Sequence, residues 1–192
     1  MGRPRTFDED RAVDRAMDVF WRKGYRGTTP QDLAEAVGIG KGSLYNAFGS
    51  KRELFTRALD RYRDQQAVLV DQALEAPGLV KERIAAALDL MIDMNAADPD
   101  HRGCLAVNTA AELAGFDQEA TERVRSMFAR TADMFLQVIR TGQATGEITR
   151  DLDPEAIAGH LLTTLVGLQL LSKTNPDPEM LKRSARIALA PL

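Results

Sequence analysis

The residues best suited to recognition chemistry lie between glycine-rich turns, in the stretch GIGKGSLYNAFGSKREL at positions 38–54. We expect a very short helix from about Lys41 to Ala47, with Leu44 and Phe48 facing a core. A helix this short is unstable alone, so packing must hold it in place. Its outer side offers small or hydrogen-bonding groups of the kind that enter the major groove of DNA. These outward residues are Lys41, Gly42, Ser43, Tyr45 and Asn46.

Groups that can contact DNA phosphates flank this short helix. Lys51 falls in the first turn of the next expected helix, whose free N–H groups also attract anions. Arg3 and Arg5, on the N-terminal tail GRPRT, are predicted to enter the minor groove. The candidates for phosphate contacts are Thr28, Thr29, Tyr45 and Lys51.

Helical periodicity runs through nearly the whole chain, and no segment shows convincing strand alternation. Thr29 is a good N-cap, Pro30 suits the first helical position, and Gly38 can end that helix with a positive φ. Two helices joined by such a short turn form a helix-turn-helix. The expected helices cover about 8–24, 29–37, 41–47, 50–74, 79–97, 103–114, 117–142, 154–173 and 178–190.

Composition describes a soluble, globular protein of 192 residues, 44% apolar and 28% charged. Residues 1–60 carry a net charge of +2 and the remainder −5, which suits a small nucleic-acid module on an acidic partner domain. The longest apolar stretch, 157–171, is shorter than the ~20 residues of a membrane span. The N-terminus lacks the apolar core of a signal peptide. We therefore expect a cytoplasmic protein without a membrane segment.

Two other classes of protein compete with a DNA-binding protein. An enzyme is disfavoured because the chain has no nucleophile motif, phosphate-binding loop or metal quartet. His101 and Cys104 supply only two ligands, so neither a metal nor a cofactor is expected. A helical adaptor that binds only protein would not need Gly40, Lys41 and Gly42 beside phosphate-anchoring hydroxyls. DNA binding with a steep salt dependence would exclude both rivals.

A family resemblance supports the DNA-binding interpretation. TTPQDLAEAVGIGKGSLYNAFGSKRELF closely resembles the N-terminal signature of the TetR/AcrR family of bacterial transcriptional regulators, and AMDVFWRKGYRGTT resembles the family's first helix and Gly-Tyr turn. The match covers about residues 7–55. It implies an all-α protein, with an N-terminal three-helix helix-turn-helix domain and a C-terminal helical bundle for ligand binding and dimerisation. It also implies a repressor released from a palindromic operator by an apolar or electrophilic small molecule, with an activator as the alternative.

The resemblance also suggests how the chain is divided. We expect a DNA-binding domain at 1–50, a connecting helix at 51–75 and a ligand-binding and dimerisation domain at 76–192, with APG at 76–78 as the boundary. The family usually dimerises through its last two helices, here about 154–173 and 178–190. The segment IAGHLLTTLVGLQLL is apolar nearly all round, which fits burial on two sides. A core helix of a monomer is the alternative.

Candidate ligand-binding residues come from the middle helices. Methionine adapts to varied apolar ligands, although methionine and phenylalanine at helical spacing also describe a plain core. Polar residues in largely apolar helices need a partner when buried, and either a ligand or another residue can supply it. The candidates are Met91, Met94, Asn108, Phe128, Phe135, His160 and Thr164.

Cys104, the single cysteine, is a further ligand-site candidate and rules out an intrachain disulfide. It lies in HRGCLAVN at the start of an expected helix, where the helix N-terminus lowers the pKa of a thiol. The stretch resembles the Gly-Cys-Leu segment of TetR-family members that sense electrophiles or oxidants. An inert buried cysteine is the alternative.

Overall fold

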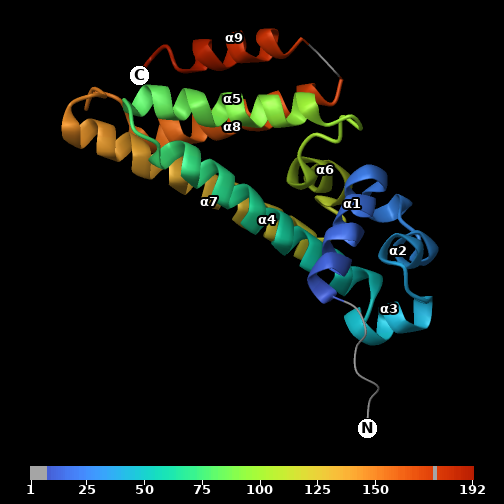
Figure 1. Ribbon diagram of the computed structural model, residues 1–192. Helices are drawn as coiled ribbons and strands as arrows, with labels where there is room; N and C mark the ends of the chain where they lie inside the picture. Colours follow the sequence, from blue (N-terminus) through green and yellow to red (C-terminus); the bar gives the residue numbers. More distant parts are fainter. Residues whose placement is uncertain (1–7, 175–176) are drawn as a thin grey trace.

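The computed structural model describes residues 8–174 and 177–192, and every regular element in these ranges is an α-helix (Figure 1). The predicted all-α fold is therefore confirmed, and most helix ends fall close to their predicted positions. The helices are α1 (Glu9–Gly27), α2 (Pro30–Val37), α3 (Lys41–Phe48), α4 (Lys51–Glu75), α5 (Val80–Ala97), α6 (Leu105–Leu113), α7 (Gln118–Thr145), α8 (Pro154–Ser172) and α9 (Pro178–Ala188).

The long helices α4 and α7 connect the two ends of the molecule (Figure 1). Helices α1, α2 and α3 gather at one end, around the beginning of α4. Helices α5, α8 and α9 stack at the other end, against the far halves of α4 and α7. Helix α6 lies between the two groups and packs on both α1 and α7. A shift of α4 or α6 would therefore reach both ends.

Local signals explain most helix limits. The Thr29 hydroxyl accepts a bond from the backbone N–H of Asp32, whose carboxylate accepts one from the Thr29 N–H, so the capping box is complete. The Ser50 hydroxyl accepts from the N–H of Glu53 at the start of α4. The first helix differs from its prediction. Gly24, expected as its end, forms a kink with φ 73° and ψ 172°, and one more turn follows before Thr28.

The buried side chains form two hydrophobic clusters. The first cluster joins α1–α4 to α6 and the beginning of α7, with Phe20, Leu44 and Leu105 among its buried members. The second cluster joins the end of α4 to α5, α7, α8 and α9, around Phe135 and Leu161. The division expected at residues 76–78 stays a prediction, but the first cluster extends across it. Helix α6 therefore helps to hold the N-terminal helices together.

Helix α8 has 19 residues and, among the described helices, is the one long and apolar enough to cross a membrane by length and composition. The apolar stretch 157–171 is itself shorter than a membrane span, but α8 extends beyond it at both ends. The finding is weak, because the core helix of a soluble protein passes the same test. In this protein α8 packs against α7 and α9.

Candidate nucleic-acid interface

The turn between α2 and α3 has helix-turn-helix geometry. Gly38 ends α2 at φ 79°, a conformation that glycine adopts without strain from a Cβ. The N–H groups of Gly38 and Ile39 both donate to the Ala34 carbonyl, at 2.9 and 3.1 Å. Arg15 on α1 donates through Nη1 to the Val37 carbonyl at 3.2 Å, which ties the end of α2 to α1. These bonds fix the direction in which α3 leaves the turn.

Helix α3 has one buried side and one free side. Leu44 and Phe48 are buried in the first hydrophobic cluster, so this side fixes the helix. The opposite side chains are exposed, apart from Tyr45, which is half-buried. Within the described residues these outward side chains form no ion pair and no side-chain hydrogen bond. They are the predicted base and phosphate contacts Lys41, Ser43, Tyr45 and Asn46.

The glycines at the start of α3 are not explained by packing within the chain. A Cβ added at Gly40 or Gly42 would meet no other atom within 4 Å. Gly40 also serves as the N-cap of α3 without any side-chain hydrogen bond. Because glycine has no side chain, another molecule can approach the backbone closely at both positions.

Lys51 occupies the first position of α4. Its Nζ lies 4.4 Å from the centroid of the Tyr25 ring, a cation–π contact. Partial burial lowers the pKa of Lys51, while the carboxylates of Glu112 and Asp32 act in the opposite direction. Thr29, the N-cap of α2, is exposed, and its hydroxyl donates to Asp32 at 2.9 Å. A cation and a hydroxyl thus stand at the N-terminal ends of α4 and α2.

The remaining predicted DNA contacts are Thr28, Arg3 and Arg5. The prediction for Thr28 is wrong, because its side chain is buried and its hydroxyl donates to the Gly24 carbonyl at 2.6 Å. Thr28 closes the last turn of α1 instead of facing outward. Arg3 and Arg5 lie outside the described residues, so their predicted role in the minor groove stays a prediction.

Polar contacts hold α1 from two places in the C-terminal part, α6 and the loop before it. The Glu112 carboxylate of α6 accepts bonds from the backbone N–H groups of Tyr25 at 2.9 Å and Arg26 at 2.6 Å, just after the kink. In the loop before α6, the guanidinium of Arg102 lies 4.3 Å from the Trp21 ring centroid. The Trp21 indole N–H donates to the Gly103 carbonyl at 3.1 Å. Movement of α6 or of its preceding loop would therefore displace α1.

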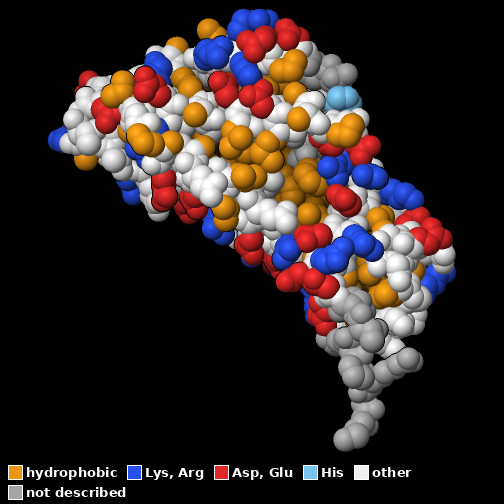
Figure 2. Space-filling model, in the orientation of Figure 1, with side chains coloured by type: hydrophobic (Ala, Val, Ile, Leu, Met, Phe, Trp, Pro, Cys, Tyr) orange, Lys and Arg blue, Asp and Glu red, His pale blue; other side chains and the backbone are white. Residues whose placement is uncertain are grey.

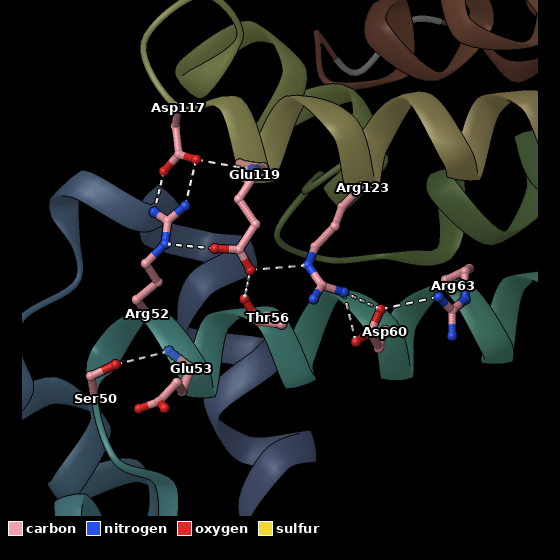
Figure 3. A network of polar contacts seen from close by, with 10 residues as sticks. Ser50, Arg52, Glu53, Thr56, Asp60, Arg63, Asp117, Glu119 and Arg123 are labelled. Atoms are coloured by element: carbon pink, nitrogen blue, oxygen red, sulfur yellow. Dashed lines mark hydrogen bonds and ion pairs between the residues drawn. The ribbon is translucent and has the colours of Figure 1, made fainter.

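A third connection joins the beginning of α4 to α7 (Figure 3). The Arg52 guanidinium contacts both carboxylate oxygens of Asp117, one of them at 2.6 Å, and its Nε contacts Glu119 at 3.1 Å. One turn further on, Arg123 of α7 pairs with Asp60 of α4 at 2.9 Å. The hydrogen bonds from Arg52 lower the pKa of the Asp117 carboxyl to about 2. This network fixes the start of α4, which carries Lys51.

Known proteins share both parts of this architecture. Residues 12–58 match the family model described as bacterial regulatory proteins of the tetR family. Residues 80–188, more than half of the chain, match the model of the tetracyclin repressor-like C-terminal domain. The chain belongs to the TetR family of transcriptional regulators. It is accordingly a DNA-binding regulator and not an enzyme.

Individual TetR-family relatives align along nearly the whole chain. The HTH-type transcriptional regulator YezE of Bacillus subtilis is 33% identical, with all of both chains covered. The HTH-type transcriptional repressor ComR of Escherichia coli is 29% identical over 98% of this chain and 90% of its own. A cysteine mutant of the TetR family regulator CifR, solved with a 26-base-pair operator duplex, is 35% identical with a TM-score of 0.88, covering 98% of each chain.

The regulator's predicted ligand residues fall into two groups. Met91 and Met94 line an open cleft of about 830 Å³ bounded by α1, α4, α5 and the loop before α6. Met91 also lines a smaller cavity of about 60 Å³, together with Cys104 and Phe128. The structure therefore brings these four residues to two neighbouring spaces, as a ligand site would require. The sequence analysis missed Trp21, which lines the cleft from α1.

The other four ligand candidates lie elsewhere. Phe135 is buried in the second hydrophobic cluster, and His160 is exposed, so neither needs a ligand as its partner. Asn108 finds partners within the chain, because it donates to the Arg102 carbonyl at 2.8 Å and accepts from Lys173 at 2.7 Å. Thr164 is half-buried on α8 and lines neither space. These four residues line neither space, and their predicted ligand contact stays a prediction.

Cys104 differs from its prediction in charge state. It is the N-cap of α6, as expected, but its side chain is buried. Burial raises the pKa of the Cys104 thiol, which outweighs the opposing hydrogen bond from the Tyr62 hydroxyl at 3.3 Å. The expected lowering of the pKa is therefore wrong, and this geometry describes an unreactive thiol.

Proposed function

We propose that this TetR-family protein is a repressor that leaves a palindromic operator when a small apolar molecule binds its C-terminal part. The free side of α3 carries the proposal for DNA, because its polar groups have no partner within the described residues and two glycines open the backbone beside them. Relatives along the chain, ComR and DhaR, are named repressors. We also propose that the protein is cytoplasmic, where it would meet its operator.

The predicted DNA contacts would have two chemical roles. Lys41, Gly42, Ser43 and Asn46 would face base edges in the major groove. The remaining residues would contact phosphates or the minor groove and so set position without carrying sequence information. These positioning residues are Thr29, Tyr45, Lys51, Arg3 and Arg5.

We further propose a homodimer through α8 and α9. Leu170 and Leu171 on α8 are about half exposed, and Ile187 on α9 is 76% exposed, which leaves large apolar side chains in water in a single chain. A Cβ added at Gly159 or Gly167 of α8 would meet no atom within 4 Å, so another helix can approach closely there. A two-fold dimer would place two copies of α3 on successive turns of a palindrome.

Release from DNA would follow from the connections to α1. A ligand that moves α6 or its preceding loop would act on α1 through Glu112, Trp21 and Arg102, and so change the spacing of the two α3 helices. Allosteric coupling of about 1–3 kcal/mol would lower operator affinity about 5- to 150-fold.

Selection of bound duplexes from a random library, at two salt concentrations, tests the DNA-binding proposal. Enrichment of a palindrome is expected, with affinity falling steeply as salt rises. Recovery of no preferred sequence by the folded protein would overturn the proposal.

Three variants then separate the roles. Lys51→Ala should weaken binding to all sequences and reduce the salt slope by about 1, whereas Lys41→Ala should change base preference. Lys81→Ala is the matched control, since Lys81 is exposed on α5 and forms no ion pair within the described residues. An unchanged preferred operator in the Lys41 variant would show that Lys41 does not read bases.

A further inference from the structure

The lining of the open cleft of about 830 Å³ indicates which class of ligand it can bind, which the proposed release mechanism does not specify. Its apolar wall combines aromatic rings from α1 and α4 with methionines from α5. Figure 2 shows hydrophobic side chains gathered on this face, around a hollow between the two ends of the molecule. The apolar lining that matters here consists of Trp21, Tyr62, Leu69, Met91 and Met94.

The cleft also contains an amide that has no hydrogen-bond partner among the described residues. Gln169, on the inner side of α8, is only 8% exposed and lines both the cleft and the smaller cavity. Its carboxamide forms no hydrogen bond with any described residue, and its polar atoms are not sealed off by protein. A ligand oxygen that enters the cavity can therefore accept a hydrogen bond from the Gln169 carboxamide in place of water.

The charges around the cleft are already neutralised. Asp98 and Arg102 are the charged residues in its lining, and they pair with each other at 2.9 Å. Arg102 also pairs with Asp18 at 2.7 Å and covers the Trp21 ring. A charged ligand would have to break these pairs or lose its hydration without compensation. A neutral ligand meets neither cost.

The shape of the apolar wall favours an aromatic ligand. The half-buried Trp21 ring packs edge-to-face with the buried Tyr62 ring, at a centroid distance of 5.0 Å and an interplanar angle of 76°, so Trp21 supplies the accessible aromatic surface of the wall. Met91 and Met94 border the same space, and thioether sulfur makes favourable contacts with aromatic ring edges. Contacts with the Trp21 ring and with methionine sulfur would act together on one planar molecule.

We propose that the cleft binds a neutral aromatic molecule whose carbonyl or hydroxyl oxygen forms a hydrogen bond with the Gln169 carboxamide. The inference rests on the proposed function, since it names the chemical class of the small molecule that would release the operator. Such a ligand touches Trp21 directly, and Trp21 belongs to α1. Ligand binding would therefore act on the hydrogen bond between Trp21 and Gly103, without first passing through the second hydrophobic cluster.

Coumarin, a flat neutral lactone, is a suitable probe for the full-length protein without DNA. Trp21 is the single tryptophan, so the ¹⁵N–¹H spectrum contains one indole cross-peak that reports on the cleft. We expect coumarin to shift this peak and to give saturable heat in calorimetry. Coumarin-3-carboxylate, which adds a negative charge, and naphthalene, which lacks the oxygen, should each bind at least about tenfold more weakly.

Variants test the role of the amide. Gln169→Leu should weaken coumarin binding about tenfold, the effect of one lost hydrogen bond. Gln137→Leu, at an exposed position of α7 outside the cleft, is the matched control and should bind coumarin unchanged. If Gln169→Leu fails to fold, Met94→Glu serves instead, because Met94 is 39% exposed and the new charge at the cleft should also weaken binding.

Three results would overturn the inference: no coumarin binding, equal binding by the Gln169→Leu and wild-type proteins, or equal binding of the carboxylate analogue. The operator is then tested separately. Coumarin binding with no change in operator affinity would leave the ligand site standing and refute the release mechanism. A palindromic operator without coumarin binding would leave the DNA-binding proposal standing and refute the ligand site.

Discussion

The contact between Arg52 and Asp117 allows a quantitative test of how α7 holds the beginning of α4. Asp117→Asn is the informative substitution, because it removes the charge while keeping the shape of the side chain. Asp117 is also the N-cap of α7, accepting from the Ala120 N–H at 2.9 Å, and asparagine caps helices about as well as aspartate. The variant therefore isolates the ion pair from the cap.

The magnitude follows from the pKa of Asp117, which falls from 3.8 to about 2 in the folded protein, chiefly through its hydrogen bonds with Arg52. A change of that size corresponds to at most about 2.5 kcal/mol of stability at neutral pH. The Asp117 side chain is 13% exposed, but that of Arg52 is 39% exposed, so solvent screens part of the interaction. We expect Asp117→Asn to lower the free energy of unfolding by about 1–2 kcal/mol.

The direction of this pKa change determines how the contribution of Asp117 to stability varies with pH. The folded-state pKa of Asp117 lies below the unfolded value, so its contribution is present above about pH 4 and is lost as the pH falls toward 2. Urea unfolding followed by circular dichroism should therefore separate wild type from Asp117→Asn at pH 7 and bring them together near pH 2. Arg125→Ala, at an exposed α7 position without an ion pair in the described structure, is the control. An equal gap at both pH values would refute the reasoning.

Two further predictions concern a backbone turn and a thiol. Gly38→Ala places a Cβ at φ 79°, so thermal unfolding should show a loss of about 1–2 kcal/mol, whereas Gly27→Ala, at a helical position, should cost little. Equal effects of the two substitutions would contradict the need for glycine at Gly38. The Cys104 thiol should react slowly with Ellman's reagent in the folded protein and rapidly in denaturant, because it is buried with a raised pKa. Rapid labelling under native conditions would be inconsistent with that burial.

The helices and the exposed side of α3 were predictable because local chemistry determines them. Local signals begin and end α2, namely the N-cap Thr29, Pro30 at the first position and Gly38 at the C-cap. Ser50 begins α4 in the same way, as its N-cap. The inward and outward sides of α3 follow from helical spacing alone. Thr28 shows the limit, since nothing local distinguishes its buried hydroxyl from the exposed one of Thr29. Only the kink at Gly24 turns the Thr28 hydroxyl inward.

The ligand region was less predictable because its contacts are distant in sequence. Asn108 accepts a hydrogen bond from Lys173, which follows it in the chain by 65 residues, with α7 and α8 in between. No spacing rule indicates that pair. A polar residue in an apolar helix was a valid signal, but it applied equally to His160, Thr164 and Gln169. Only Gln169 faces the cavities, and helical period without knowledge of the neighbouring helices could not select it.

The first hydrophobic cluster limits how this regulator can be recombined with others. Leu105, Val107 and Leu113 of α6 complete the core around α1–α4, although they lie beyond residues 76–78. A hybrid made by cutting at 76–78, to give the same DNA-reading helices a different sensor, would leave that core open on one side. A hybrid protein therefore has to keep α6 together with α1–α4.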